Sequence, residues 1–194
     1  MEREATNYPP TQDQTVSFEP SLSLLEVTSD SEFKDYFKQL QQVFIYVTDR
    51  CNLGCEQCLY KPLLRQGEEF RLDVAVSLLA EFRKNGADKL SVLGGEPTTY
   101  KNLPELIRYS KETGYKYVRM DTNGQFDSSL LDNRDIQRLD EITFSLDGDT
   151  PEINDPLRGK GTFAKCLENI KKAVSLGLNV NITCCVHRGN VGRD

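Results

Sequence analysis

The 194-residue sequence lacks any long apolar run. Its longest apolar stretches, Val43 to Val47 and Val74 to Ala80, are far shorter than the roughly 18 to 20 residues that cross a bilayer. The first residues also lack the basic segment and apolar run of a secretory signal. We therefore expect a cytoplasmic protein without a membrane segment. In that reducing compartment its six cysteines are more often ligands, catalysts or buried thiols than disulfides.

The sequence also lacks a block of basic residues, an internal repeat and a low-complexity segment. Lys and Arg total 24 against 30 Asp and Glu, which gives a net charge of −6 and an isoelectric point near 5.0. This acidic balance argues against non-specific binding to nucleic acid or to an anionic membrane surface. With 38% hydrophobic and 28% charged residues, the composition is that of an ordinary globular protein.

The pattern along the chain predicts an N-terminal arm followed by a folded core. Residues 1–42 are polar and contain several prolines, and the S-x-x-E pattern of Ser29 and Glu32 predicts a short capped helix near the end of this arm. Residues 43–194 are expected to form the core, whose length is that of one domain.

Short β-branched runs alternate with helical periodicity throughout this core. The expected strands are Val43–Thr48, Lys89–Leu93, Lys116–Met120, Glu141–Leu146 and Leu178–Val186. The expected helices between them are Leu72–Asn85, Pro104–Thr113, Ser128–Leu139 and Phe163–Leu176. Such alternation is typical of βαβ units and a parallel sheet, so the fold class is α/β. Ligands are expected at the carboxyl ends of the strands.

Three cysteines with the spacing C-x3-C-x2-C directly follow the first expected strand: Cys51, Cys55 and Cys58. A closed zinc site needs four ligands, and further candidates such as His187 lie four strands away. A [4Fe–4S] cluster has four irons, so three thiolates would leave one iron open to a substrate or cofactor. The spacing favours such a cluster, with a zinc or redox cysteine module as the alternative.

Further motifs follow the next strands. Gly94-Gly95-Glu96-Pro97 comes after the second strand and Asp121-Thr122-Asn123-Gly124 after the third. Ser145-Leu146-Asp147-Gly148 follows the fourth strand, and Arg158-Gly159-Lys160-Gly161-Thr162-Phe163 lies beyond it. With the cysteine loop, these segments resemble the radical S-adenosylmethionine (radical SAM) superfamily, in the branch that often carries SPASM or twitch extensions. The resemblance covers roughly residues 43–190.

This resemblance implies a partial parallel (βα)6 barrel, of which the sequence supplies about five βα units. The sixth unit is missing, so we expect either a fragment of a longer protein or a shortened member completed by its own arm or by a partner. The implied cofactors are a [4Fe–4S] cluster and S-adenosylmethionine (SAM), with an external electron donor. The implied reaction cleaves SAM reductively to a 5′-deoxyadenosyl radical, which abstracts hydrogen from a peptide or protein substrate. A truncated scaffold that binds both cofactors without catalysis is the alternative.

The resemblance also implies that the turn after the second strand holds the amino group of SAM through its backbone and its acid. Glycines in this turn allow close approach of the backbone to a ligand. The residues implied are Gly94, Gly95, Glu96 and Pro97. The resemblance also implies Asn123 as a contact to SAM, although Asn-Gly is also an ordinary turn dipeptide.

Three residues near the fourth strand complete the implied cofactor site. Ser145 would contact the ribose or carboxylate of SAM, and Arg158 would bind its carboxylate, for which the planar guanidinium is suited. Asp147 has three alternatives: it could bind the cofactor, face the substrate or cap the turn before Gly148.

The sequence departs from the family pattern beside the third cysteine. The family usually has an aromatic residue there that packs on adenine, and this chain has Gln57. Tyr60 is an alternative for that contact, and a buried core tyrosine is the plainer interpretation.

The remaining cysteines are interpreted as structural. Cys184 and Cys185 are adjacent on an expected strand and should point to opposite faces, so they are poorly placed to hold one metal. Together with Cys166 they are expected to be small buried hydrophobes. His187 is interpreted as a loop residue.

Overall fold

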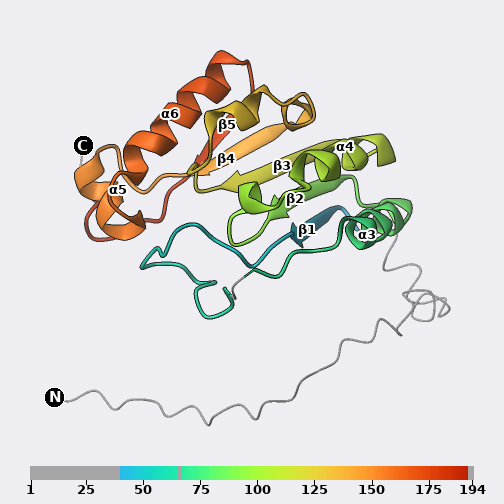
Figure 1. Ribbon diagram of the computed structural model, residues 1–194, viewed down its shortest axis with the longest axis horizontal. Coiled ribbons are helices and arrows are strands. Elements are labelled where there is room, and N and C mark those ends of the chain that lie inside the picture. The colour runs from blue at the N-terminus through green and yellow to red at the C-terminus, as the bar shows by residue number, and fades with distance from the viewer. Residues whose placement is uncertain (1–39, 65–66, 192–194) are drawn as a thin grey trace, which may run out of the picture. The chain divides into compact units, whose positions relative to one another are not determined.

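Five parallel strands form one sheet in the order β1-β2-β3-β4-β5 (Figure 1). The computed structural model describes residues 40–64 and 67–191. The strands are β1 Gln42–Tyr46, β2 Lys89–Leu93, β3 Tyr117–Thr122, β4 Glu141–Ser145 and β5 Val180–Thr183. The expected parallel α/β fold is therefore confirmed. The helix expected near Ser29 lies outside the described residues, so the division at residue 42 stays a prediction.

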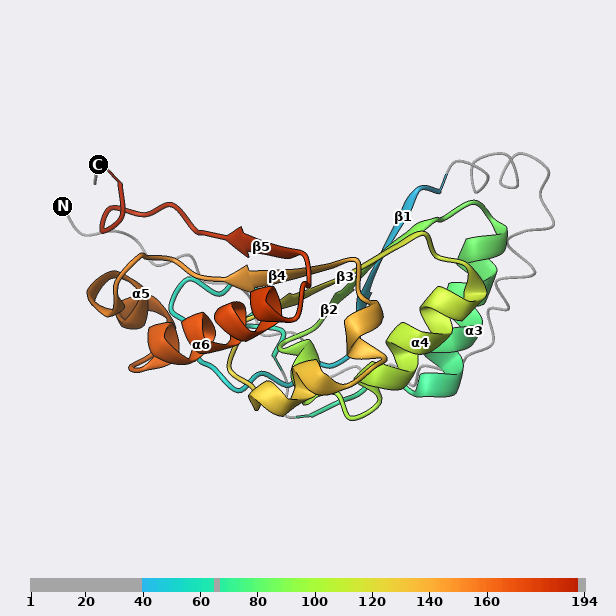
Figure 2. The ribbon, with the colours of Figure 1, turned by 90° about the horizontal axis from the view of Figure 1, so that it is seen from above.

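Along the described part of the chain, four α-helices follow β1, β2 and β4, and three of them cover one side of the sheet. They are α3 Leu72–Lys84, α4 Leu103–Thr113, α5 Pro151–Arg158 and α6 Thr162–Ser175. Figure 2 shows α3, α4 and α6 on the same side of the strands. In the described residues no helix is long and apolar enough to span a bilayer.

The two faces of the sheet differ because successive side chains along a strand point in opposite directions. The face toward the helices is apolar and fully buried, with Leu90, Val92, Val118, Met120, Ile142 and Phe144 each at 0% exposure. On the other face, strand register aligns Phe44, Ser91, Arg119 and Glu141 in one row. Parallel strands are usually apolar on both faces, so the polar side chains in this row indicate a face that meets a polar ligand or solvent.

The helix expected at Ser128–Leu139 is wrong. The segment forms two short 3₁₀ helices, η2 Ser128–Asp132 and η3 Ile136–Arg138, separated by residues 133–135, of which Asn133 is extended. The Asn133 side chain accepts a hydrogen bond from the backbone N–H of Asp135 at 2.8 Å. Short polar side chains compete in this way with the backbone bonds of a continuous helix.

Two other elements differ from expectation. Helix α5 was not expected, because it is only eight residues long and contains Pro156, so it has little periodicity to detect. Strand β5 ends at Thr183 rather than continuing to Val186. The chain after Thr183 instead turns toward the site described below.

Phe144→Ala is expected to destabilise the fold far more than Phe44→Ala. Phe144 is fully buried and stacks on Phe126 with ring centroids 6.4 Å apart, whereas Phe44 on the opposite face is 54% exposed. The expected loss in free energy of unfolding is about 3 to 5 kcal/mol for Phe144→Ala and less than about 1 kcal/mol for Phe44→Ala. Urea denaturation measures both, and equal losses would contradict the assignment of the two faces.

Candidate functional site

The loops that carry the sequence motifs meet at the carboxyl edge of the sheet, because all five strands run in the same direction. The turn after β2 is bonded to the cysteine loop after β1: the N–H of Gly95 donates to the carbonyl of Thr48, and that of Glu96 donates to the carbonyl of Arg50, both at 2.8 Å. A Cβ atom at position 95 would collide with the Arg50 carbonyl, so only glycine permits this approach.

The three thiols of the cysteine loop are free and half-buried. Burial raises the pKa of Cys51 and Cys55, while the positive charge of Arg158 opposes the rise at Cys55. The Cys55 thiol lies 4.0 Å from the carbonyl oxygen of Arg158. The end of α5 therefore lies directly against the cysteine loop.

The donor set fits a three-thiolate cluster better than a closed zinc site. Within residues 40–64 and 67–191, no three His, Cys, Asp or Glu side chains are already arranged around a metal position. Cys51, Cys55 and Cys58 would have to turn toward a common centre on binding. Three nearby thiols without a fourth ligand suit a [4Fe–4S] cluster with one open iron.

Glu96 is buried inside the protein, with only 1% of its surface exposed. Its Oε1 accepts hydrogen bonds from the N–H and hydroxyl of Thr98 and from the hydroxyl of Thr122, and its Oε2 accepts one from the N–H of Asn123 at 2.7 Å. Burial raises the pKa of Glu96, and these donors act against the rise. This carboxylate thus ties the turn after β2 to the loop after β3. Its expected contact with SAM stays a prediction.

Asn123 also contacts the cysteine loop. Its side-chain nitrogen lies 3.8 Å from the Cys51 sulfur and donates to the Asn52 side chain at 2.8 Å. The following Gly124 has a φ of +75° and packs against Cys166, where a Cβ atom would lie 2.7 Å from the sulfur. The buried position expected for Cys166 is therefore confirmed, and it maintains the turn that presents Asn123.

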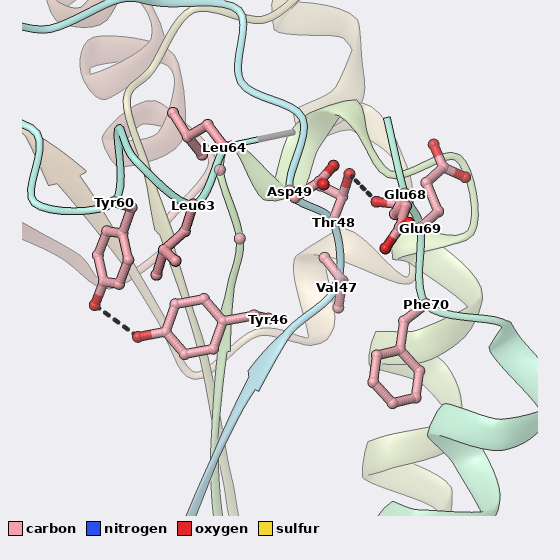
Figure 3. Close-up of a pocket in the computed structure, with 12 residues that line it drawn as sticks. Tyr46, Val47, Thr48, Asp49, Tyr60, Leu63, Leu64, Glu68, Glu69 and Phe70 are labelled. Carbon is pink, nitrogen blue, oxygen red and sulfur yellow. Dashed lines mark hydrogen bonds between the residues drawn. The ribbon is translucent and has the colours of Figure 1, made fainter. Parts of the chain in front are cut away.

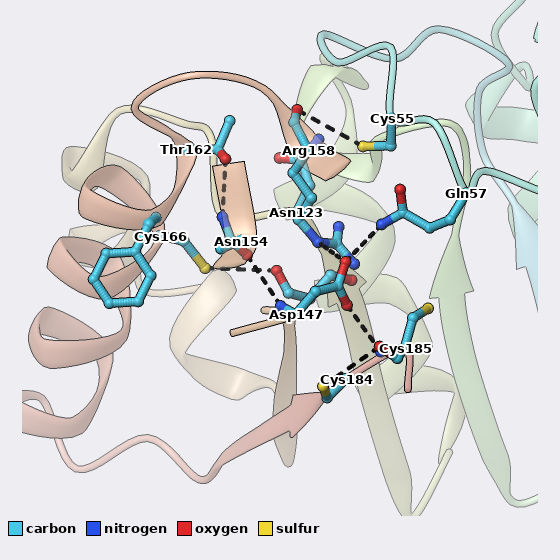
Figure 4. A network of polar contacts seen from close by, with 12 residues as sticks. Cys55, Gln57, Asn123, Asp147, Asn154, Arg158, Thr162, Cys166, Cys184 and Cys185 are labelled. Carbon is cyan, nitrogen blue, oxygen red and sulfur yellow. Dashed lines mark hydrogen bonds and ion pairs between the residues drawn. The ribbon is translucent and has the colours of Figure 1, made fainter. Parts of the chain in front are cut away.

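Asp147 is completely buried at the site, and its hydrogen bonds reach three different segments (Figure 4). Its Oδ2 accepts hydrogen bonds from Gln57 Nε2 at 2.6 Å and from Arg158 Nε at 2.7 Å. Its Oδ1 accepts one from the N–H of Cys185 at 2.8 Å, and its carbonyl accepts one from the Asn190 side chain at 2.8 Å. A single acid therefore joins the cysteine loop, the end of α5 and the segment after β5.

Arg158 forms a buried ion pair with Asp147, since its side chain is 10% exposed and that of Asp147 is 0% exposed. Only its Nε is bonded to Asp147, and its two terminal nitrogens make no hydrogen bond to another described residue. This arrangement fixes the guanidinium plane while leaving a two-nitrogen fork for a ligand, as carboxylate binding requires. Ser145 ends β4 beside Thr183 of β5, and its expected contact with SAM stays a prediction.

Two expectations about burial are wrong. Cys184 and Cys185 are exposed rather than buried, because β5 is an edge strand that ends before them. Tyr60 is not a core residue either: it is 44% exposed, and its hydroxyl lies 2.7 Å from the hydroxyl of Tyr46 (Figure 3). This hydrogen bond is the main cause that raises the pKa of Tyr46 to about 12.

The two tyrosines line a pocket of about 530 Å³ beside the turn after β2, and sequence reasoning did not find this pocket. Its other lining residues are Val47, Thr48, Asp49, Leu63, Leu64, Glu68, Glu69, Phe70, Gly94 and Gly95. Sequence reasoning also missed the bond between Gln57 and Asp147. No local pattern signals a contact between residues 90 positions apart.

The fold and site define a parallel α/β protein with a three-cysteine loop at the ligand-binding edge of its sheet. The chain belongs to the radical SAM superfamily, whose model matches residues 45–194. Members of this superfamily use a [4Fe–4S] cluster and SAM.

Among curated relatives, a probable GTP 3′,8-cyclase of Saccharolobus islandicus (strain M.14.25 / Kamchatka #1) is 31% identical over 156 residues, which are 79% of this chain and 50% of the relative. Molybdenum cofactor biosynthesis protein 1 of Bos taurus is 32% identical over 151 residues, 75% of this chain and 24% of the relative. The chain thus spans half the length, or less, of these curated relatives.

Two solved structures are similar in fold. One is anSMEcpe with bound AdoMet and the Kp18Cys peptide, at 25% identity and a TM-score of 0.63, covering 74% of this chain and 43% of that one. The other is SuiB of Streptococcus suis bound to the precursor peptide SuiA, at 19% identity and a TM-score of 0.69, covering 93% and 41%.

Asp147→Asn is expected to lower the free energy of unfolding by about 3 kcal/mol, because it leaves the buried Arg158 without its counter-ion. Asp132→Asn is the matched control, since it breaks the exposed pair with Lys172 and should cost less than about 1 kcal/mol. Urea denaturation of both variants checks the difference. A loss in Asp147→Asn no greater than in the control would contradict the role of Asp147 as the link between loops.

Proposed function

We propose that this chain holds a [4Fe–4S] cluster through Cys51, Cys55 and Cys58 and binds SAM beside it, as the core of an enzyme. The observation that carries the proposal is the convergence of three other loops on the cysteine loop. Asn123 reaches the Cys51 sulfur, the Arg158 carbonyl reaches the Cys55 thiol, and the turn after β2 is bonded to the cysteine-loop backbone.

Held by Cys51, Cys55 and Cys58, the cluster would supply the electron for reductive cleavage of SAM, and the chemistry available at the site would be hydrogen abstraction. The residues of the chain bind and orient SAM. Asp147 holds Arg158 by its Nε, so the two terminal nitrogens of the guanidinium are available to the carboxylate of SAM. The backbone of Gly94 and Gly95 binds the amino group of SAM. Ser145 contacts the ribose or the carboxylate of SAM. The electron comes from an external donor.

A peptide or protein is the proposed substrate. The matched structures of anSMEcpe and SuiB carry peptides according to their descriptions, and the former is 25% identical to this chain. The face of the sheet opposite the helices supports this choice over a nucleotide such as GTP. At its centre, Arg119 lies 3.4 Å from Asp121 and 4.0 Å from Glu141, so its charge is already balanced by carboxylates. A triphosphate needs cations that are free to pair with it.

The proposal is tested by 5′-deoxyadenosine formation from SAM after anaerobic reconstitution with iron and sulfide and chemical reduction. Wild type is expected to form the product, and Cys51→Ala/Cys55→Ala/Cys58→Ala is expected to form none, because it removes all three thiolates. Cys184→Ala is the control, since this exposed thiol lies outside the cysteine loop.

Iron and sulfide content must be measured in each preparation. A wild-type protein with a complete cluster that binds SAM but forms no product would favour the non-catalytic scaffold. Bound zinc without sulfide would favour the zinc or redox cysteine module.

Arg158→Lys is expected to raise the dissociation constant of SAM at least about tenfold, because lysine keeps the charge but loses the planar fork. Isothermal titration of the cluster-loaded, oxidised protein measures binding without cleavage. Arg138→Lys is the control, since Arg138 is a surface residue paired with Glu112. Unchanged SAM affinity in Arg158→Lys would exclude Arg158 from the carboxylate site.

A further inference from the structure

The side-chain amide of Asn123 contacts both its own loop and the cysteine loop. Its Oδ1 accepts a hydrogen bond from the N–H of Gln125 at 2.8 Å, which fixes the orientation of the amide. Its Nδ2 donates to Asn52 Oδ1 at 2.8 Å and lies 3.8 Å from the Cys51 sulfur. An amide nitrogen carries two hydrogens, so Asn52 takes one and the other is left for the sulfur.

Further bonds within the protein hold Asn123 at this position. The residue is only 8% exposed, and its backbone N–H donates to Glu96 Oε2 at 2.7 Å. On the other side of the turn, the buried Asn169 of α6 donates to the carbonyl of Gly124 at 2.9 Å. Both the backbone and the side chain of Asn123 are therefore fixed by the chain itself.

Cys51 differs in this respect from the other two thiols of the cysteine loop. In the part of the chain that the structure describes, its sulfur is the only one of the three that a side-chain donor reaches, and the Cys55 thiol faces the carbonyl of Arg158 instead. Asn52, which is bonded to the same amide, directly follows Cys51 in the chain. The Cys51 side chain can therefore turn toward a cluster while its sulfur stays beside this donor.

Binding to iron makes the Cys51 sulfur a better acceptor. A thiol accepts hydrogen bonds weakly, whereas a thiolate carries negative charge, and hydrogen bonds to charged acceptors are the stronger ones. This charge increases when the cluster takes up an electron. Hydrogen bonds to the sulfurs are one of the factors that set the reduction potential of an iron–sulfur cluster. A donor at Cys51 therefore favours the reduced form of the cluster over the oxidised form.

We infer that Asn123 Nδ2 donates a hydrogen bond to the Cys51 sulfur in the cluster-bound protein and thereby raises the reduction potential of the cluster. This inference rests on the proposed function, because it requires the cluster. It differs from the SAM contact implied for Asn123 by the resemblance, since both hydrogens of the amide are already used. An easier reduction also means that the external electron donor can have a less negative potential.

The test is the midpoint potential of the cluster without SAM, measured from the electron paramagnetic resonance signal of the reduced form at a series of applied potentials. Asn123→Leu removes the donor and keeps the size of the side chain, and Asn123→Ala is a second variant. In both, the reduced form is expected to be about tenfold less favoured than in wild type. For one electron this is a shift of about 59 mV to more negative potential.

Gln125→Leu is the matched control, because it removes another amide from the same loop. The Gln125 side chain donates to the carbonyls of Asn123 and Thr162, and the backbone N–H that orients Asn123 is kept in this variant. Its midpoint potential should equal that of wild type. Incomplete loading with cluster lowers the intensity of the signal and leaves the midpoint unchanged.

A second measurement uses the unmutated chain. Pulsed electron paramagnetic resonance of the reduced protein, labelled with ¹⁵N only in the side-chain amides of asparagine, should show a weak ¹⁵N coupling. The bonded hydrogen connects the amide to the Cys51 sulfur and so to the cluster. The coupling should be lost in Asn123→Leu, which distinguishes Asn123 from Asn52.

Midpoint potentials of both Asn123 variants equal to that of wild type, or the absence of the ¹⁵N coupling, would overturn the inference. Either result would leave the proposed function standing, because the cluster would still be bound by the three thiols. A wild-type protein that holds no cluster after reconstitution would overturn both.

Discussion

The site depends on the burial of one carboxylate. Asp147 is completely enclosed, and a buried charge is tolerated only when it is paired and fully hydrogen-bonded. The partners that satisfy it come from the cysteine loop, the end of α5 and the segment after β5. Leaving this acid without partners would cost free energy. Asp147 therefore holds together three segments that share no strand or helix. Glu96 has the same effect on the turn after β2 and the loop after β3.

The sheet positions the loops of the site, and the two buried acids connect these loops to one another. Parallel strands bring every motif to one edge, and the apolar face under the helices supplies the packing that fixes the strands. Loops at that edge lack the regular backbone bonds of a strand or helix, so buried side chains replace them. On the opposite face, Arg119 donates a hydrogen bond to Ser91, and no helix within residues 40–64 and 67–191 covers this polar row. A substrate that approaches this face meets charges that are already balanced.

Most of the fold could be predicted from the sequence, because βα alternation depends on local periodicity. The failures occurred where local competition or tertiary contacts decide the structure. Asn133 interrupts an otherwise periodic helix because its side chain bonds the backbone of a neighbouring residue. Helix α5 was missed because it is short and contains Pro156. The motif residues could be predicted from the sequence. The bond between Gln57 and Asp147 could not, because no local pattern marks a hydrogen bond between residues 90 positions apart. Cys185 was likewise misjudged, because its exposure depends on where the edge strand ends.

The central claim is that the cysteine loop leaves one iron open to SAM. Electron–nuclear double resonance on the reduced, cluster-loaded chain, with SAM carrying ¹⁵N in its amino group, tests it most directly. The expected result is a ¹⁵N coupling that appears on addition of labelled SAM and is replaced by a ¹⁴N coupling with unlabelled SAM. A cluster spectrum that SAM leaves unchanged, in a protein with full iron and sulfide content, would contradict the account.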